Sequence, residues 1–170
     1  MSDVLASWNA LPDAEATQEI LPCCGSRVWA HQMASRRPIS NETALLRACD
    51  EVWRNLPEAD WGEAFRSHPR IGELPAPDAA GARSGNWSGE EQKRVTTAGR
   101  DIKLALADGN RAYEQRFNRI FIVCATGKSG HHILEILQRR LRNDDQAELL
   151  EAAEQQRQIM HIRLKKWLGT

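Results

Sequence analysis

The spacing of apolar residues predicts a chain built from amphipathic α-helices. Between Asn41 and Asn55, leucine, cysteine, valine and tryptophan side chains recur three and four residues apart, which places them on one helix face. Similar spacing predicts further helices over residues 13–22, 26–36, 60–65, 88–109, 110–117, 129–141 and 144–168. At 170 residues the chain has the size of one domain. We therefore expect an all-α fold, a single compact domain of about eight helices over residues 1–170.

Two stretches do not follow the helical pattern. Residues 120–125, Ile-Phe-Ile-Val-Cys-Ala, form the one β-like run, and no second run could pair with it. We therefore predict no sheet. Two alternatives remain for these residues: an extended buried segment or the start of a core helix. Residues 70–87 are rich in proline, glycine and alanine and lack periodicity. Long irregular segments are often functional, and a plain surface connection is an equal alternative.

The composition removes several classes of protein. The 23 basic and 23 acidic residues give a formal net charge of zero, whereas a nucleic-acid-binding protein normally carries a basic excess. No stretch approaches the roughly 20 apolar residues of a membrane span, and the first residues do not resemble a secretory signal. The four cysteines contain no C-x-x-C pair, which favours reduced thiols in the cytoplasm.

The tetrad Ser67-His68-Pro69-Arg70 is the first candidate for chemistry. A histidine side chain changes its protonation near neutral pH, so His68 can give or take a proton. Pro69 restricts the backbone beside it and ends the preceding helix. The alternative for His68 is a structural histidine at a helix end, bonded to a carbonyl group.

The run Ser88-Gly89-Glu90-Glu91-Gln92 is the second candidate. Ser88 and Glu91 have the spacing of a capping box, which predicts that a helix begins at Ser88. The free N–H groups of a helix N-terminus also attract anions, so a substrate carboxylate could bind there. Gln92 adds a neutral donor and acceptor.

Metal and nucleotide motifs are incomplete. His131 and Glu135 lie four residues apart, but no H-E-x-x-H order and no third ligand is evident, so we predict no metal site. Gly127-Lys128-Ser129 ends like a phosphate-binding loop, yet Ile122 stands where that motif needs its first glycine. We therefore predict no ATP binding.

These motifs resemble those of the 2-oxo-4-hydroxy-4-carboxy-5-ureidoimidazoline (OHCU) decarboxylases over nearly the whole chain. The matching residues are Ser67 to Glu73, Trp87 to Gln92, Tyr113, Arg116-Phe117, Phe121 to Gly127, Ile133-Leu134, Arg140-Leu141, Asn143, Glu148 and Ile162 to Leu164. The family commonly has glycine after the Arg/Lys-Phe pair, where this chain has Asn118. Asparagine tolerates left-handed backbone better than most residues, so the turn can survive.

The resemblance implies an all-helical, cofactor-free enzyme of urate breakdown that converts OHCU to (S)-allantoin. It implies that His68 is the catalytic acid and Glu91 its carboxylate partner. It also implies homodimers and a substrate site lined by Pro69, Ser88, Gln92, Phe121, Ile122, Val123, Cys124 and Ala125.

The reaction itself needs no cofactor, because the C=N unit of OHCU beside the carboxylate-bearing carbon can accept the electron pair. Two rival functions stay open. A helical interaction module without catalysis fits the apolar faces equally well. A metal-dependent hydrolase would use the four residues His68, His131, His132 and Glu135.

Overall fold

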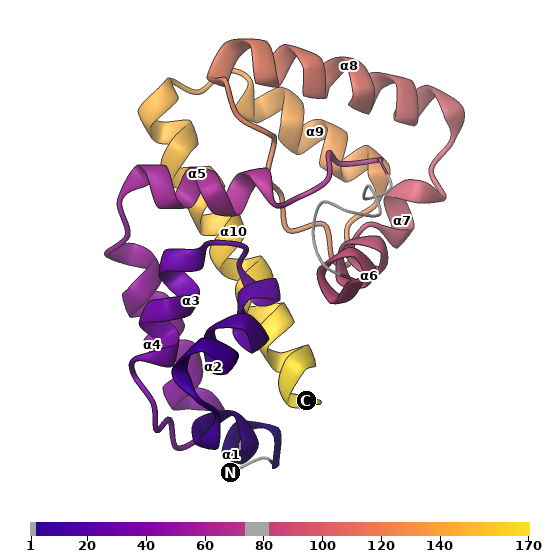
Figure 1. Cartoon of the computed structure of the whole chain (residues 1–170). Coiled ribbons are helices and arrows are strands. Elements are labelled where there is room, and N and C mark those ends of the chain that lie inside the picture. The colour runs from indigo at the N-terminus through magenta and orange to yellow at the C-terminus, as the bar shows by residue number, and fades with distance from the viewer. Residues whose placement is uncertain (1–2, 74–81) are drawn as a thin grey trace. The chain divides into compact units, whose positions relative to one another are not determined.

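The computed structural model describes residues 3–73 and 82–170, and this part of the chain is all-α (Figure 1). It contains ten α-helices, one 3₁₀-helix and no strand within those residues. The all-α prediction is confirmed. The chain divides into two compact units, one made of Met1–Ala64 with Arg157–Thr170 and the other of Phe65–Gln156. The assignment of residues 1–170 to one domain stays a prediction.

The first unit contains the N-terminal helices and the end of the last helix. Its elements are α1 (Asp3–Ala10), α2 (Asp13–Ile20), η1 (Leu21–Cys23), α3 (Arg27–Ala34), α4 (Glu42–Arg54), most of α5 (Glu58–Arg66) and the C-terminal part of α10 (Asp145–Leu168). The side chain of Ser26 caps α3 and that of Asn41 caps α4, each accepting a hydrogen bond from a backbone N–H. The helices predicted over residues 13–65 are therefore confirmed. Helix α1 was missed because only Leu5 and Trp8 are buried in its eight residues, too few to show a period.

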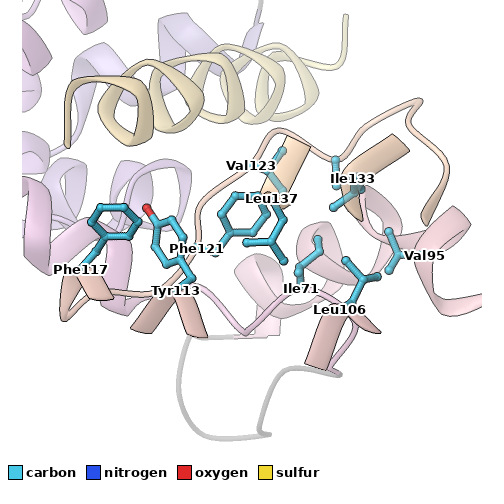
Figure 2. Close-up of a cluster of buried hydrophobic side chains, with 10 residues drawn as sticks. Ile71, Val95, Leu106, Tyr113, Phe117, Phe121, Val123, Ile133 and Leu137 are labelled. Carbon is cyan, nitrogen blue, oxygen red and sulfur yellow. The ribbon is translucent and has the colours of Figure 1, made fainter. Parts of the chain in front are cut away.

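The second unit contains all the predicted site residues. Its elements are the end of α5, α6 (Ala82–Glu91), α7 (Lys93–Thr96), α8 (Arg100–Phe117), α9 (Gly130–Arg140) and the first half of α10. Helix α8 packs along α9, and α7 packs against α9 (Figure 1). The core of this unit is one hydrophobic cluster (Figure 2), made of Ile71, Val95, Leu106, Tyr113, Phe117, Phe121, Val123, Ala125, Ile133 and Leu137. None of the described helices is both long enough and apolar enough to cross a membrane.

The helix predicted to begin at Ser88 is wrong at both ends. Helix α6 begins at Ala82, inside the stretch predicted as irregular, and ends at Glu91. The remainder of that stretch, residues 74–81, lies outside the described residues. The helix is interrupted first at Gln92, between α6 and α7. It is interrupted again between α7 and α8, where the hydroxyl groups of Thr96 and Thr97 both donate to the carbonyl oxygen of Lys93. Such bonds compete with the helical pattern, so the chain turns there.

The two helices predicted on either side of Gly109 are a single helix, α8. Glycine suggested a helix end, but here it permits close packing. A Cβ atom at Gly109 would lie 2.5 Å from Cδ2 of Leu137 on α9, which is closer than two carbon atoms can approach. Gly109 therefore leaves room for the side chain of Leu137 to pack against α8.

We expect the substitution Gly109→Ala to lower the free energy of unfolding, because the usual cost of overpacking a core, about 1–3 kcal/mol, exceeds the gain of about 0.5–1 kcal/mol from replacing a helical glycine. The control is Gly89→Ala, because a Cβ atom on Gly89 of α6 would meet nothing within 4 Å. Alanine in place of this helical glycine is expected to raise the free energy of unfolding by about 0.5–1 kcal/mol. Denaturant unfolding measures both, and equal effects of the two substitutions would contradict the packing role.

The segment after α8 is extended and buried. Asn118 ends the helix in the left-handed region at φ 51°, and its N–H donates to the carbonyl oxygen of Glu114 at 2.9 Å. The expectation that asparagine supports this turn is confirmed. Residues 121–125 then run through the core without helical or strand pairing, and all five are buried. The extended alternative is confirmed, and the start of a core helix is wrong.

Candidate active site

Side chains hold residues 121–125 in place where a sheet would use neighbouring strands. Nη1 of Arg140 donates to the carbonyl oxygen of Ile122 at 2.6 Å. The N–H of Cys124 donates to Oε1 of Gln155 at 2.9 Å, and its carbonyl oxygen accepts from Nζ of Lys128 at 2.7 Å. Buried backbone groups need such partners. The segment is therefore fixed in position although it belongs to no sheet.

A fully buried ion pair lies behind this segment. The side chains of Arg140 on α9 and Glu148 on α10 are both 0% exposed. Nε and Nη2 of Arg140 donate to Oε1 of Glu148 at 2.9 and 2.5 Å, and the hydroxyl group of Tyr113 donates to the same oxygen at 2.5 Å. The Arg140 guanidinium also lies 4.7 Å from the ring centre of Phe121. The charge of Arg140 is thus neutralised inside the core.

Two further effects belong to this network. Burial, and after it the hydrogen bond to Glu148, raises the pKa of Tyr113, which therefore stays protonated as a donor. Figure 2 shows Tyr113 beside Phe117 and Phe121 in the core. The amide of Asn143 donates to Oε2 of Glu148 at 2.9 Å, so both carboxylate oxygens have partners. A buried ion pair is stable only when its other polar groups are satisfied in this way.

His68 follows the C-terminus of α5. Its N–H donates to the carbonyl oxygen of Phe65 at 3.1 Å, and its side chain is half-buried with Nε2 shielded from solvent. The next residues are tied to α8. Nε and Nη2 of Arg70 donate to the two carboxylate oxygens of Glu114 at 2.5 and 2.9 Å, and the amide of Asn110 donates to the carbonyl oxygen of Ile71 at 3.0 Å. These bonds fix the backbone that follows His68 and Pro69.

Gln92 links the two sequence motifs. Its side chain is buried, and Oε1 accepts a hydrogen bond from the N–H of Gly72 at 2.8 Å. Gly72 is the fourth residue after His68, and Gln92 follows Glu91. The structure therefore brings the end of α6 against the loop that follows His68. Ser88 is buried and Glu91 is half-buried in the last part of α6.

The predicted capping box at Ser88 and Glu91 is wrong. Ser88 lies well inside α6, which begins at Ala82, so no helix N-terminus and no anion site of that kind exists at Ser88. The residues from Ala82 to Asn86 include glycine and serine, which are weak helix formers, and hide the true start of the helix.

Glu91 lies close enough to Cys124 for its charge to act on the thiol of that residue. Burial raises the pKa of the Cys124 thiol, the positive charge of Lys128 lowers it, and the negative charge of Glu91 raises it. Together with the bond between Gln92 and Gly72, this brings three chain segments to one region: residues 68–72, 88–92 and 121–125.

Metal ligands do not gather around His68 in the described part of the chain. His131 and Glu135 contact each other on the surface of α9, with Nε2 to Oε1 at 3.3 Å. The one group of three ligands within coordinating range among the described residues is Cys49, Asp50 and His161 in the first unit. Nη1 of Arg157 donates to Oδ1 of Asp50 at 3.2 Å. A guanidinium already occupies the place of a cation, and we assign no metal to this group.

The chain is similar in sequence to two characterised proteins. The uric acid degradation bifunctional protein TTL of Arabidopsis thaliana is 33% identical over 144 residues, which are 85% of this chain and 44% of the plant protein. The chain thus spans less than half of that relative. The 2-oxo-4-hydroxy-4-carboxy-5-ureidoimidazoline decarboxylase of Amia calva is 29% identical over 158 residues, covering 86% of this chain and 81% of that protein.

The chain is also similar to solved structures. A crystal structure of OHCU decarboxylase in the presence of (S)-allantoin superimposes with a TM-score of 0.77 at 30% identity, covering 89% of this chain and 98% of the other. A crystal structure of (S)-allantoin synthase shares the fold, with a TM-score of 0.72 at 16% identity over 96% of this chain and 53% of the other. The sequence profile of the OHCU decarboxylase family matches residues 9–165. This chain therefore belongs to the OHCU decarboxylase family.

Proposed function

We propose that this protein is a cofactor-free decarboxylase that converts OHCU to (S)-allantoin in urate breakdown. Membership of the family carries the proposal, because the profile spans almost the whole chain. The substrate is the one named for the Amia calva relative, and the product is the compound named for the crystallised decarboxylase.

The site that we assign lies where the three segments meet. His68 acts as the catalytic acid and Glu91 as its partner, while Pro69, Ser88, Gln92 and the five residues from Phe121 to Ala125 line the substrate. The hydrogen bond between Gln92 and Gly72 supports this assignment, since it joins the two motifs. The fixed backbone of residues 121–125 supports it further.

The electron flow follows from the structure of the substrate. When the C–C bond to the carboxylate breaks, its electron pair forms a C=C bond to the ureido-bearing carbon, and the π pair of the C=N unit moves to nitrogen. The nitrogen takes up a proton. The resulting enol then gains a proton at the ureido-bearing carbon and loses its hydroxyl proton to become a carbonyl group. Carbon dioxide leaves, and the product is allantoin.

The protein residues have separate tasks in this scheme. His68 delivers the proton to one face of the ureido-bearing carbon, which makes a single stereoisomer. Glu91 accepts a hydrogen bond from the hydroxyl group and holds the imidazole. The side chain of Gln92 and backbone groups of residues 121–125 bind the ring and ureido amides, which pair well with neutral donors and acceptors. Holding the carboxylate out of the ring plane favours its loss.

The proposed function is tested by generating the unstable substrate in place from urate. We expect the purified protein to form optically pure (S)-allantoin faster than the spontaneous reaction, as circular dichroism would report. Racemic allantoin at the background rate from folded protein would overturn the proposal and leave the helical interaction module as the alternative.

We also propose a cytoplasmic homodimer. The location is supported by the four cysteines, which are buried thiols that form no disulfide within the described residues. Most apolar residues of the last helix, among them Leu149, Ile159, Leu164 and Trp167, are buried within the single chain, so this helix offers little apolar contact surface beyond the exposed Leu150. Sedimentation at several concentrations tests the assembly, and a monomer at every concentration would contradict it.

A further inference from the structure

We propose that Lys128 supplies the positive charge that binds the carboxylate of the substrate beside residues 121–125. The inference rests on the proposed function, and it adds a cationic residue to the substrate site assigned above, which contains none. Lys128 lies in the turn between this segment and α9, and its side chain is partly buried.

The ammonium group of Lys128 is held at the segment. Its Nζ donates to the carbonyl oxygen of Cys124 at 2.7 Å, and its backbone N–H donates to the carbonyl oxygen of Ala125 at 3.0 Å. The neighbouring Gly127 has φ 79°, and its carbonyl oxygen accepts from Nη1 of Arg94 at 3.0 Å. One bond to a carbonyl group leaves an ammonium with two further protons to donate.

Among the described residues, two cationic side chains, those of Lys128 and Arg140, donate to carbonyl groups of residues 121–125, and only Lys128 can reach a ligand. Arg140 also contacts the segment, but it is 0% exposed and bonded to Glu148, so it cannot reach a ligand. Lys128 makes no ion pair within the described part of the chain. The charge of Glu91 reaches Cys124 as well. A negatively charged substrate that enters beside Glu91 needs a cation to offset the repulsion and its lost hydration.

The role predicts an effect on substrate binding more than on turnover. A cation on the substrate carboxylate stabilises the bound ground state, and this stabilisation weakens as the carboxylate becomes neutral carbon dioxide. Removing the cation should therefore raise KM without lowering kcat. A hydrogen bond to a charged group is worth roughly 1.5–3 kcal/mol, which corresponds to at least about tenfold in KM.

Three substitutions separate the charge from the hydrogen bond to Cys124. Lys128→Gln keeps a donor without the charge, Lys128→Met removes both, and Lys128→Arg keeps the charge. We expect KM for OHCU to rise at least about tenfold in the glutamine and methionine variants, and to stay within about threefold in the arginine variant. The value of kcat/KM should also depend less on salt in the two uncharged variants. The exposed Lys103 of α8 gives the control, since Lys103→Met should change nothing.

The outcomes are distinct, and a thermal melt of each variant checks that it is folded. A normal KM in Lys128→Gln with a raised KM in Lys128→Met would overturn the inference, because the hydrogen bond and not the charge would then matter. A normal KM in both would overturn it too. In either case the proposed function survives, because the wild-type protein is active. An inactive wild-type protein would contradict both the proposed function and this inference.

Discussion

Replacing His68 with asparagine is expected to lower kcat for OHCU at least about a hundredfold, because positioned acid–base groups typically contribute about 10²–10⁴ to the rate. Asparagine keeps a hydrogen-bond donor but cannot deliver a proton at neutral pH. The backbone around His68 is held by the bonds of Arg70 and Ile71 to α8, so the fold should remain intact. A coupled assay from urate measures the rate, and the optical purity of the allantoin should fall with it.

The matched control is His131→Asn, since this histidine is exposed on α9, with 71% of its side chain accessible. It should leave kcat unchanged.

The effect of Glu91→Gln on kcat can be measured in the same assay. Glu91 lies at the C-terminal end of α6, so the substitution removes no helix cap. Turnover by His68→Asn within about threefold of the wild type would refute the role of the imidazole.

Replacing Arg140 with methionine is expected to lower the free energy of unfolding by about 3–5 kcal/mol. The substitution leaves Glu148 buried without its counter-charge and removes the donor to the carbonyl oxygen of Ile122. Breaking one side of a buried pair is costly because the other charge has no water to solvate it. Urea denaturation of the purified variants measures the change.

Arg139→Met is the matched control, because Arg139 is the neighbouring residue and its pair with Glu151 is partly exposed. Exposed pairs contribute about 0–1 kcal/mol. A second variant that replaces both Arg140 and Glu148 with methionine should recover part of the loss, since no charge is then left unpaired. Equal losses for Arg139→Met and Arg140→Met would contradict the buried network.

The sequence predicted those helices whose apolar period is clear. Residues 41–55 have this signal, and the structure has α4 there, with Asn41 as its cap. The wrong predictions of helix boundaries concern residue types that often end or begin a helix but that have another role in this structure. Gly109 suggested a helix end, but a neighbouring helix needs its missing Cβ atom, and only tertiary packing reveals this. Ser88 and Glu91 matched a cap by spacing alone, although the helix begins six residues earlier.

The buried ion pair was predictable in part. Arg140 follows Leu137 by three residues and Ile133 by seven, so it occupies the core face of α9 and should have raised the question of a partner. Its partner Glu148 is on another helix, and no local pattern identifies it. The candidate site has the same limit. The motifs around His68 and Glu91 could be selected from the sequence, but the bond that joins their segments, from Gly72 to Gln92, depends on the fold.

The most direct test is a crystal structure of this protein with (S)-allantoin bound. The account predicts that the imidazole of His68 and the carboxylate of Glu91 both lie within hydrogen-bond distance of the same ligand molecule, between Gln92 and residues 121–125. A ligand bound elsewhere, or side chains of His68 and Glu91 that point to different surfaces, would contradict it.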